Sequence, residues 1–238
     1  MLKSTLLAAT ITALMLSTAA AQSSPAGDRM RLAQNTQSNS DKDNSRDATL
    51  ADAASINEDL IGFALDAKAD RVAEKVVEMR KALYNLRPLL NERLFETVGH
   101  QVADMERASA KEDLLGTALA AVETFRVIEN AKGDANRPEP VEVALLDYSG
   151  FKLSILLAAH AVDWATVDST AKESDTTWMA LAKNIQEISI RNLVGTIQNG
   201  LRAAVARKDI NGAKFAAKMQ LEVVDTLEDY FKRVKERR

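Results

Sequence analysis

Apolar residues recur at three- and four-residue intervals through most of the chain, the spacing that places them on one face of an α-helix. From Ser55 onward this pattern is nearly continuous, as in the run of Leu60, Phe63, Ala64 and Ala67. No segment shows the strict alternation of apolar and polar residues that is typical of a half-buried β-strand. The pattern therefore predicts an all-α fold.

Helix boundaries are predicted from capping boxes, in which a Ser or Thr and a Glu three residues later satisfy free backbone N–H groups. Three such pairs occur: Ser55 with Glu58, Ser109 with Glu112, and Thr170 with Glu173. Pro88 should break the first helical stretch, and Gly133 should end the third. We expect about six helices, over residues 55–88, 88–108, 109–133, 141–167, 170–206 and 212–235.

The two halves of the helical region are similar in sequence. A shift of 96 positions places Val98, Gly99, Asp113 and Gly116 on Val194, Gly195, Asp209 and Gly212, and a shift of 88 places Asp59, Gly62 and Phe63 on Asp147, Gly150 and Phe151. We therefore expect two diverged three-helix repeats, at 55–134 and 135–238. Since neither could bury its apolar stripe alone, the two should form one globular domain, an elongated bundle with a shared core.

The first 54 residues differ from the rest of the chain. Lys3, the apolar run at 6–20 and the alanines that precede Gln22 have the pattern of a secretory signal peptide at 1–21. Residues 22–54 are rich in Gln, Ser, Asn and Asp, so we expect a disordered polar leader. The chain has no Cys, and an exported protein without disulfides fits a bacterial periplasm. No later stretch is long and apolar enough to predict a transmembrane segment in the mature chain.

Charge and motifs exclude several classes of function. The chain has 31 Lys and Arg against 34 Asp and Glu, evenly mixed, so no nucleic-acid partner is expected. It has no nucleophile elbow, no His-Glu-x-x-His, no P-loop and no dinucleotide fingerprint. We therefore expect a protein that is not an enzyme, and no motif identifies a cofactor.

Two aspartates at equivalent positions suggest a ligand site. Asp59 and Asp147 each lie three residues before a glycine inside a predicted helix, and such a glycine costs up to about 1 kcal/mol of helix propensity. Close helix packing at Gly62 and Gly150 is one explanation. The other is a pocket between the halves, onto which both aspartates face. The candidate ligand-binding residues are Asp59, Asp147, Tyr148, Lys152, Trp164 and Trp178.

Two further groups have the spacing of metal ligands on a helix. His160 and Asp163 are three residues apart, and Glu96, His100 and Asp104 are four apart, so the side chains of each group share a helix face. The alternative interpretation is a solvated charged stripe around His100 and a histidine at the rim of the core for His160. A haem held by His160 and a methionine is also possible.

These features favour an exported periplasmic binding or accessory protein, non-enzymatic, that recognises a small ligand or a protein partner between its halves. One alternative is a periplasmic metal- or haem-binding helical bundle. Another is a structural interaction module that pairs as a homodimer. The sequence identifies neither the ligand nor the partner.

Overall fold

The computed structural model describes residues 25–133, 137 and 139–237, with side chains from Ser45 onward. The chain divides into two compact units, 1–40 and 41–238. Of the first unit, the structure describes one stretch of helix, the N-terminal part of α1 (Pro25–Leu65). The predicted signal peptide at 1–21 lies outside the described residues, so cleavage and export stay predictions.

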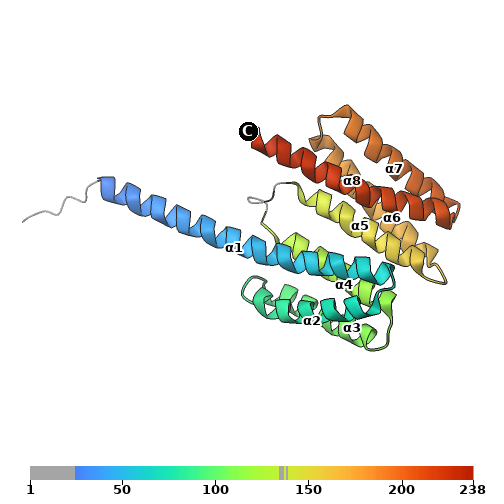
Figure 1. Cartoon of the computed structure of the whole chain (residues 1–238). Helices are drawn as coiled ribbons and strands as arrows, with labels where there is room; N and C mark the ends of the chain where they lie inside the picture. Colours follow the sequence, from blue (N-terminus) through green and yellow to red (C-terminus); the bar gives the residue numbers. More distant parts are fainter. Residues whose placement is uncertain (1–24, 134–136, 138, 238) are drawn as a thin grey trace, which may run out of the picture. The chain divides into compact units, whose positions relative to one another are not determined.

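The part of the chain that the structure describes contains helices and no β-strand, which confirms the predicted all-α class. Its elements are α1 (Pro25–Leu65), α2 (Ala69–Leu86), α3 (Glu92–Ser109), α4 (Leu114–Ala131), α5 (Val141–Ala158), α6 (Trp164–Leu181), the short 3₁₀-helix η1 (Ala182–Asn184), α7 (Ile188–Ala206) and α8 (Ile210–Glu236) (Figure 1).

The prediction of about six helices is wrong, because the described residues contain eight α-helices. Three of the predicted helices are interrupted, at residues 66–68, 159–163 and 182–187. At the first break Ala67 has a positive φ of 55° and ends α1. None of the three breaks contains Gly or Pro, the residues that punctuate helices most strongly, so the sequence carries little signal for them.

None of the three capping boxes begins a helix. Ser55 lies inside α1 and Thr170 inside α6, while Ser109 is the last residue of α3. The side-chain N-caps that the structure does contain are Asn or Asp residues. They are Asn91 before α3, Asp113 before α4, Asp163 before α6 and Asp209 before α8, each accepting hydrogen bonds from first-turn backbone N–H groups.

Over residues 25–54, within the segment predicted as a disordered leader, the structure has helix α1, which begins at Pro25. Leu50, Ala53 and Ala54 are buried in the core of the second unit. They are too few, and two of them too small, to form a recognisable apolar period in a polar segment. The boundary predicted at residue 55 therefore has no structural counterpart.

Within the second unit, helices that follow one another in the chain pack side by side from α2 to α8, and α8 returns to α5. Helices α5, α6, α7 and α8 thus close into a four-helix bundle, the second helix group. Helices α1, α2, α3 and α4 form the first helix group. There α1 contacts α2 through Asn57, whose Nδ2 donates to Met79 Sδ at 3.3 Å. It contacts α4 through Arg46, which donates to Ala131 O. The link between the groups is the packing of α4 on α5.

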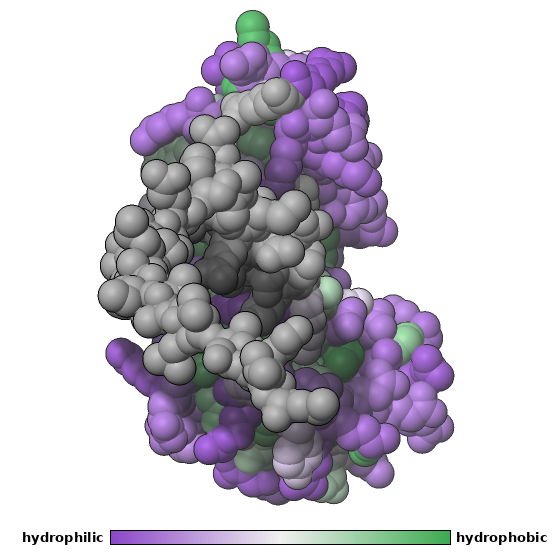
Figure 2. Space-filling view, turned by 90° about the vertical axis from the view of Figure 1, so that its left-hand side faces the viewer, coloured by the Kyte–Doolittle hydropathy of each residue, from purple (hydrophilic) through white to green (hydrophobic). Residues whose placement is uncertain are grey.

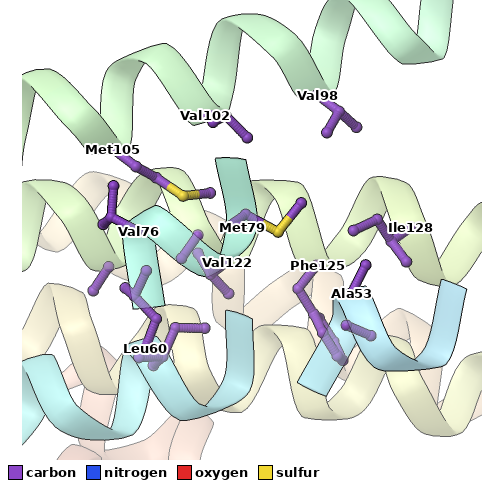
Figure 3. Packing of buried hydrophobic residues seen from close by; sticks show 14 of the residues in the cluster. Ala53, Leu60, Val76, Met79, Val98, Val102, Met105, Val122, Phe125 and Ile128 are labelled. Carbon is purple, nitrogen blue, oxygen red and sulfur yellow. The ribbon is translucent and has the colours of Figure 1, made fainter. Parts of the chain in front are cut away.

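Buried apolar residues form three clusters, and the first of them includes Tyr148 and Ile155 of α5 as well as residues of the first helix group. The first cluster fills the first helix group, with Leu60, Met79, Met105 and Phe125 contributed by four different helices (Figure 3). The other two clusters lie in the second helix group.

A layer of buried polar side chains crosses the second helix group. Its members are Ser149, Ser174, Gln198 and Gln220, one from each helix and each at most 1% exposed. Gln220 Nε2 donates to Ser149 Oγ at 2.8 Å, and Gln220 Oε1 accepts from Ser174 Oγ and Gln198 Nε2, both at 3.0 Å. Because these groups satisfy one another, the layer specifies how the four helices align.

The two glycines at equivalent positions have different surroundings. A Cβ atom added at Gly150 would lie 2.7 Å from Leu221 Cδ2, so α5 and α8 approach closely there. A Cβ added at Gly62 would meet nothing within 4 Å, and this residue is exposed. Close packing therefore explains Gly150 but not Gly62.

This difference predicts opposite effects of the same substitution. Gly62→Ala should raise the free energy of unfolding by about 1 kcal/mol, because alanine is the better helix former and nothing obstructs it. Gly150→Ala should lower it by about 1 kcal/mol, since displacing Leu221 outweighs the gain in propensity. Urea denaturation of both variants provides the measurement. Equal stabilisation by the two substitutions would contradict the close approach of α5 and α8.

Candidate functional site

A surface cavity of about 320 Å³ lies between α1, α5 and α8 in the second unit. It is lined by Glu58, Asp147, Phe151, Leu221, Glu222, Val224, Asp225 and Glu228. Five of these eight residues are acidic, and no basic side chain is among the described residues that line it. We call it the acidic cavity.

Helix α8 supplies three of the carboxylates. Glu222, Asp225 and Glu228 follow one another at three-residue spacing, which places them along one face of the helix. From the first to the third, the row extends about 9 Å along the helix axis, at 1.5 Å per residue. Glu58 on α1 and Asp147 on α5 complete the acidic lining, and Phe151, Leu221 and Val224 supply its apolar part.

Asp147 lines the cavity from α5, and the pKa of its carboxyl group is perturbed. Burial, followed by the nearby negative charges of Glu58 and Glu228, raises its pKa well above the ordinary value. The residue stays partly exposed through the cavity. No described residue donates a hydrogen bond to its carboxylate or forms an ion pair with it. An ionised carboxylate in such a place loses hydration without gaining a partner, which is costly.

Other carboxyl groups around the cavity also have raised pKa values. Burial, together with the charges of Glu139 and Asp225, raises the pKa of Glu228 to about 7. Burial also raises the pKa of Glu58 and of Glu139. At neutral pH the cavity therefore holds negative charges that repel one another and that the folded chain compensates only in part.

Two basic side chains that act on the cavity carboxylates through their charge form ion pairs with another residue, Glu129. Lys132 and Arg137, in the segment between α4 and α5, both pair with Glu129, Arg137 Nη1 lying 3.3 Å from Glu129 Oε2. The side chains of Arg137 and Glu129 are each 5% exposed, so this pair is buried. Lys235 Nζ donates to the carbonyl oxygen of Arg137 at 3.0 Å, which fastens the same segment to α8. The charge of Lys132 lowers the pKa of Glu58, and the charges of Arg137 and Lys132 lower that of Glu139, but both pKa values stay above the ordinary value.

Of the two aspartates predicted to face a common pocket, Asp147 lines the acidic cavity and Asp59 does not. The Asp59 side chain is 52% exposed and forms an ion pair with Lys75 at 3.1 Å. Its neighbour Glu58 lines the cavity instead. Adjacent residues point about 100° apart on a helix, and the sequence could not reveal which of the two faces inward.

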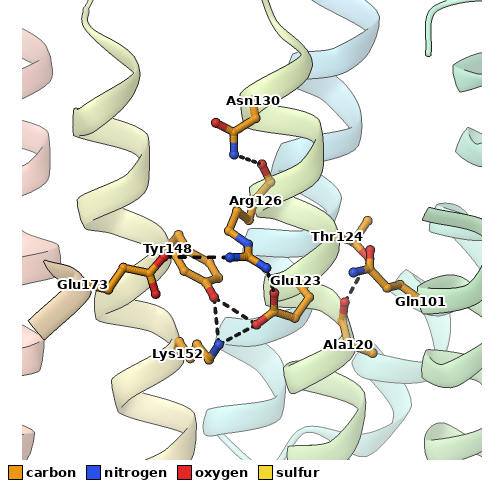
Figure 4. Close-up of polar contacts among 9 residues, drawn as sticks. All are labelled: Gln101, Ala120, Glu123, Thr124, Arg126, Asn130, Tyr148, Lys152 and Glu173. Carbon is orange, nitrogen blue, oxygen red and sulfur yellow. Dashed lines mark hydrogen bonds and ion pairs between the residues drawn. The ribbon is translucent and has the colours of Figure 1, made fainter. Parts of the chain in front are cut away.

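Tyr148 and Lys152 lie where α5 packs against α4, outside the cavity lining. Both hydrogen-bond to Glu123 Oε1, Tyr148 Oη at 2.9 Å and Lys152 Nζ at 2.7 Å (Figure 4). Arg126 packs over the Tyr148 ring at 5.0 Å and also pairs with Glu123. Burial raises the pKa of Glu123, but the hydrogen bond and charge of Lys152 outweigh it and leave the pKa below the ordinary value. These residues join the two helix groups.

The two tryptophans also lie away from the cavity. Trp178 is 7% exposed and belongs to one apolar cluster of the second helix group. Trp164, the first residue of α6, packs against the other cluster. Both therefore stabilise the second helix group.

The predicted metal ligands are not brought together. His160 is exposed in the break between α5 and α6, and Asp163 caps α6 by accepting from the backbone N–H groups of Ala165 and Thr166. Glu96, His100 and Asp104 are exposed on α3, and Asp104 pairs with Arg107. Across the described residues, no three His, Asp or Glu side chains could hold a metal ion.

The sequence analysis missed Glu58, Glu222, Asp225 and Glu228 as site residues. Acidic residues at this spacing on α8 have the pattern of an ordinary solvent-exposed helix face. Their role depends on α1 and α5 lying opposite, which periodicity in one helix cannot show. Glu58 was assigned to a helix cap that does not form.

No protein-family model, no curated protein and no solved structure was found to match this chain. In the part of the chain that the structure describes, no helix combines the length and apolar character that crossing a membrane requires. Function has to be inferred from the chemistry of the acidic cavity.

The raised pKa values predict how stability depends on pH. For a carboxyl group whose pKa is higher in the folded than in the unfolded state, stability is greatest below the unfolded value and falls as pH rises through the folded value. With unfolded values near 4.5 and Glu228 at about 7, the free energy of unfolding should fall between pH 5 and pH 8. Urea denaturation at a series of pH values measures this slope.

Two matched variants test whether the pH dependence of stability comes from the cavity carboxylates. Asp147→Asn removes one of the unfavourable charges, so the decrease in stability between pH 5 and pH 8 should become shallower. Asp59→Asn, at the equivalent position outside the cavity, should change the slope much less, because the Asp59 charge is only a minor cause of the raised pKa of Glu58. The same slope in Asp147→Asn and wild type would show that Asp147 does not carry the pH dependence.

Proposed function

We propose that this chain is an exported, non-enzymatic binding protein that holds a small cationic ligand in the acidic cavity. The observation that carries the proposal is Asp147, a carboxylate that lines the cavity and has no partner among the described residues. Carboxylates that repel one another across a cavity bind a cation favourably, because its charge removes the repulsion. The folded chain alone is therefore less stable at neutral pH than its complex with a cation.

The position of the cavity also supports a binding role. Glu58 belongs to the first helix group, whereas Asp147 and the α8 residues belong to the second. A cation held between them contacts both groups at once and strengthens their association. Ligand sites form readily in such positions between packed helices.

We infer further that the two helix groups are diverged copies of one four-helix unit. Asp113 and Asp209 cap α4 and α8 by accepting from the N–H groups of Gly116 and Gly212. The residues just before these caps both have positive φ, 57° at Glu112 and 54° at Lys208. This equivalence supports a duplication with four helices in each copy, in place of the three predicted from the sequence.

The proposed export to a periplasm is supported by the signal-peptide pattern at 1–21 and the absence of Cys. The alternative of a homodimeric interaction module has weaker support. Figure 2 shows a face on which hydrophilic residues predominate and hydrophobic ones are scattered, outside the residues drawn in grey. Large exposed apolar side chains in the described chain, such as Tyr84, Ile188 and Phe215, lie on different helices.

A panel of small cations tests the proposal. We expect at least one among n-butylammonium, tetramethylammonium, arginine, 1,5-diaminopentane and Ca²⁺ to bind the full chain with one-to-one stoichiometry in isothermal titration calorimetry at pH 8. Asp147→Asn should weaken that binding at least about tenfold, equivalent to about 1.4 kcal/mol. Asp59→Asn, which removes one negative charge outside the cavity, should leave it unchanged.

The control variant matters because both substitutions change the net charge equally. Equal weakening by the two would mean non-specific attraction to an acidic protein. No binding of any member of the panel at millimolar concentration would reject a cationic ligand.

A further inference from the structure

We infer that the preferred ligand of the acidic cavity is a linear diammonium compound or polyamine, with ammonium groups joined by a chain of methylenes. The inference rests on the proposed function and adds the class of ligand. Its basis is the way in which charged and apolar residues are distributed along the cavity.

The negative charge is spread out along the cavity. On α8, Glu222 and Glu228 are separated by about 9 Å along the helix axis, with Asp225 between them. Glu58 and Asp147 lie on two other helices. One compact cation cannot be close to all of these carboxylates, whereas two or more ammonium groups on one chain can pair with several of them.

A metal ion fits this arrangement poorly. Ca²⁺ needs six to eight oxygen ligands at 2.3–2.6 Å, and Mg²⁺ needs a nearly regular octahedron. Among the described residues, no three acidic or His side chains are placed to share an ion. The carboxylates therefore suit a ligand whose positive charges are separated from one another.

The apolar part of the lining suits a methylene chain. Phe151 and Leu221 line the same cavity as the carboxylates, and their partly exposed side chains offer surface on which methylenes lose contact with water. Quaternary ammonium ligands are typically recognised by cages of several aromatic rings, and Phe151 is the single aromatic residue of this lining. The volume of about 320 Å³ lies at the small end of ligand pockets, which fits a thin flexible chain.

Asp147 provides an observation independent of the clustering of charge. Its side chain is partly buried at the cavity, and the carboxylate has no hydrogen-bond donor among the described residues. An ammonium group has three N–H donors and a positive charge, so it satisfies this carboxylate in both respects. We assign one end of the ligand to Asp147 and the other to the row on α8.

The test compares 1,4-diaminobutane, spermidine, n-butylammonium, tetramethylammonium and Ca²⁺ as calorimetric titrants of the full chain at pH 8 and low salt. The diamine and spermidine should bind at least about tenfold more tightly than n-butylammonium, which shares the chain but has one charge. Affinity should decrease as salt is raised, because the α8 carboxylates are exposed and screened.

Two variants distinguish the ends of the ligand. Asp147→Asn should weaken the binding of both 1,4-diaminobutane and n-butylammonium, since each compound places an ammonium group at Asp147. Glu228→Gln should lower the affinity for 1,4-diaminobutane and leave the affinity for n-butylammonium nearly unchanged. The preference for a compound with two charges would then be lost. Asp59→Asn should alter neither affinity, and circular dichroism should show unchanged helix content in all variants.

The outcomes separate this inference from the proposed function. If n-butylammonium bound as tightly as 1,4-diaminobutane and depended on Asp147, the diammonium inference would be wrong and the cation site would stand. Tightest binding of Ca²⁺ or tetramethylammonium would also overturn the inference alone. If none of the five bound, or if Asp147→Asn bound all of them as well as wild type, both proposals would fall.

Discussion

The packing of α5 on both sides is the constraint on which the rest of the second unit depends. This helix is apolar around most of its circumference, and such a helix is stable only where other helices cover it. Tyr148 and Ile155 belong to the core of the first helix group, while Leu146 and Leu153 belong to clusters of the second. Asp147 on this helix lines the acidic cavity, together with residues of α1 and α8.

Charge is distributed unequally around this central helix. Where α5 meets α4, Glu123 is matched by Lys152 and Arg126, so the contact between the groups stabilises the fold. At the cavity, Asp147 and its acidic neighbours have no such match among the described residues, and their ionisation costs stability at neutral pH. A binding site commonly carries unfavourable interactions of this kind, because the ligand supplies what the free protein lacks.

The sequence predicted some of this structure, and physical reasons explain what it missed. Apolar periodicity is a property of each helix by itself, so the all-α class could be recognised from the sequence. The breaks near Ala67 and at 182–187 could not, because they contain no helix-breaking residue. Asp147 could be singled out from its matched position with Asp59. That Glu58 and Glu228 face it depends on the packing of three helices from distant parts of the chain, which no local pattern records.

The polar layer of the second helix group has a mechanical consequence. Sliding one of its helices by a turn, about 5.4 Å, would separate Gln220 from Ser149, Ser174 and Gln198 and leave buried amides without partners. In the first helix group the core between α1 and α2 includes Met79, whose flexible side chain adapts to small displacements. The wall formed by α5 and α8 is thus the stiff side of the cavity.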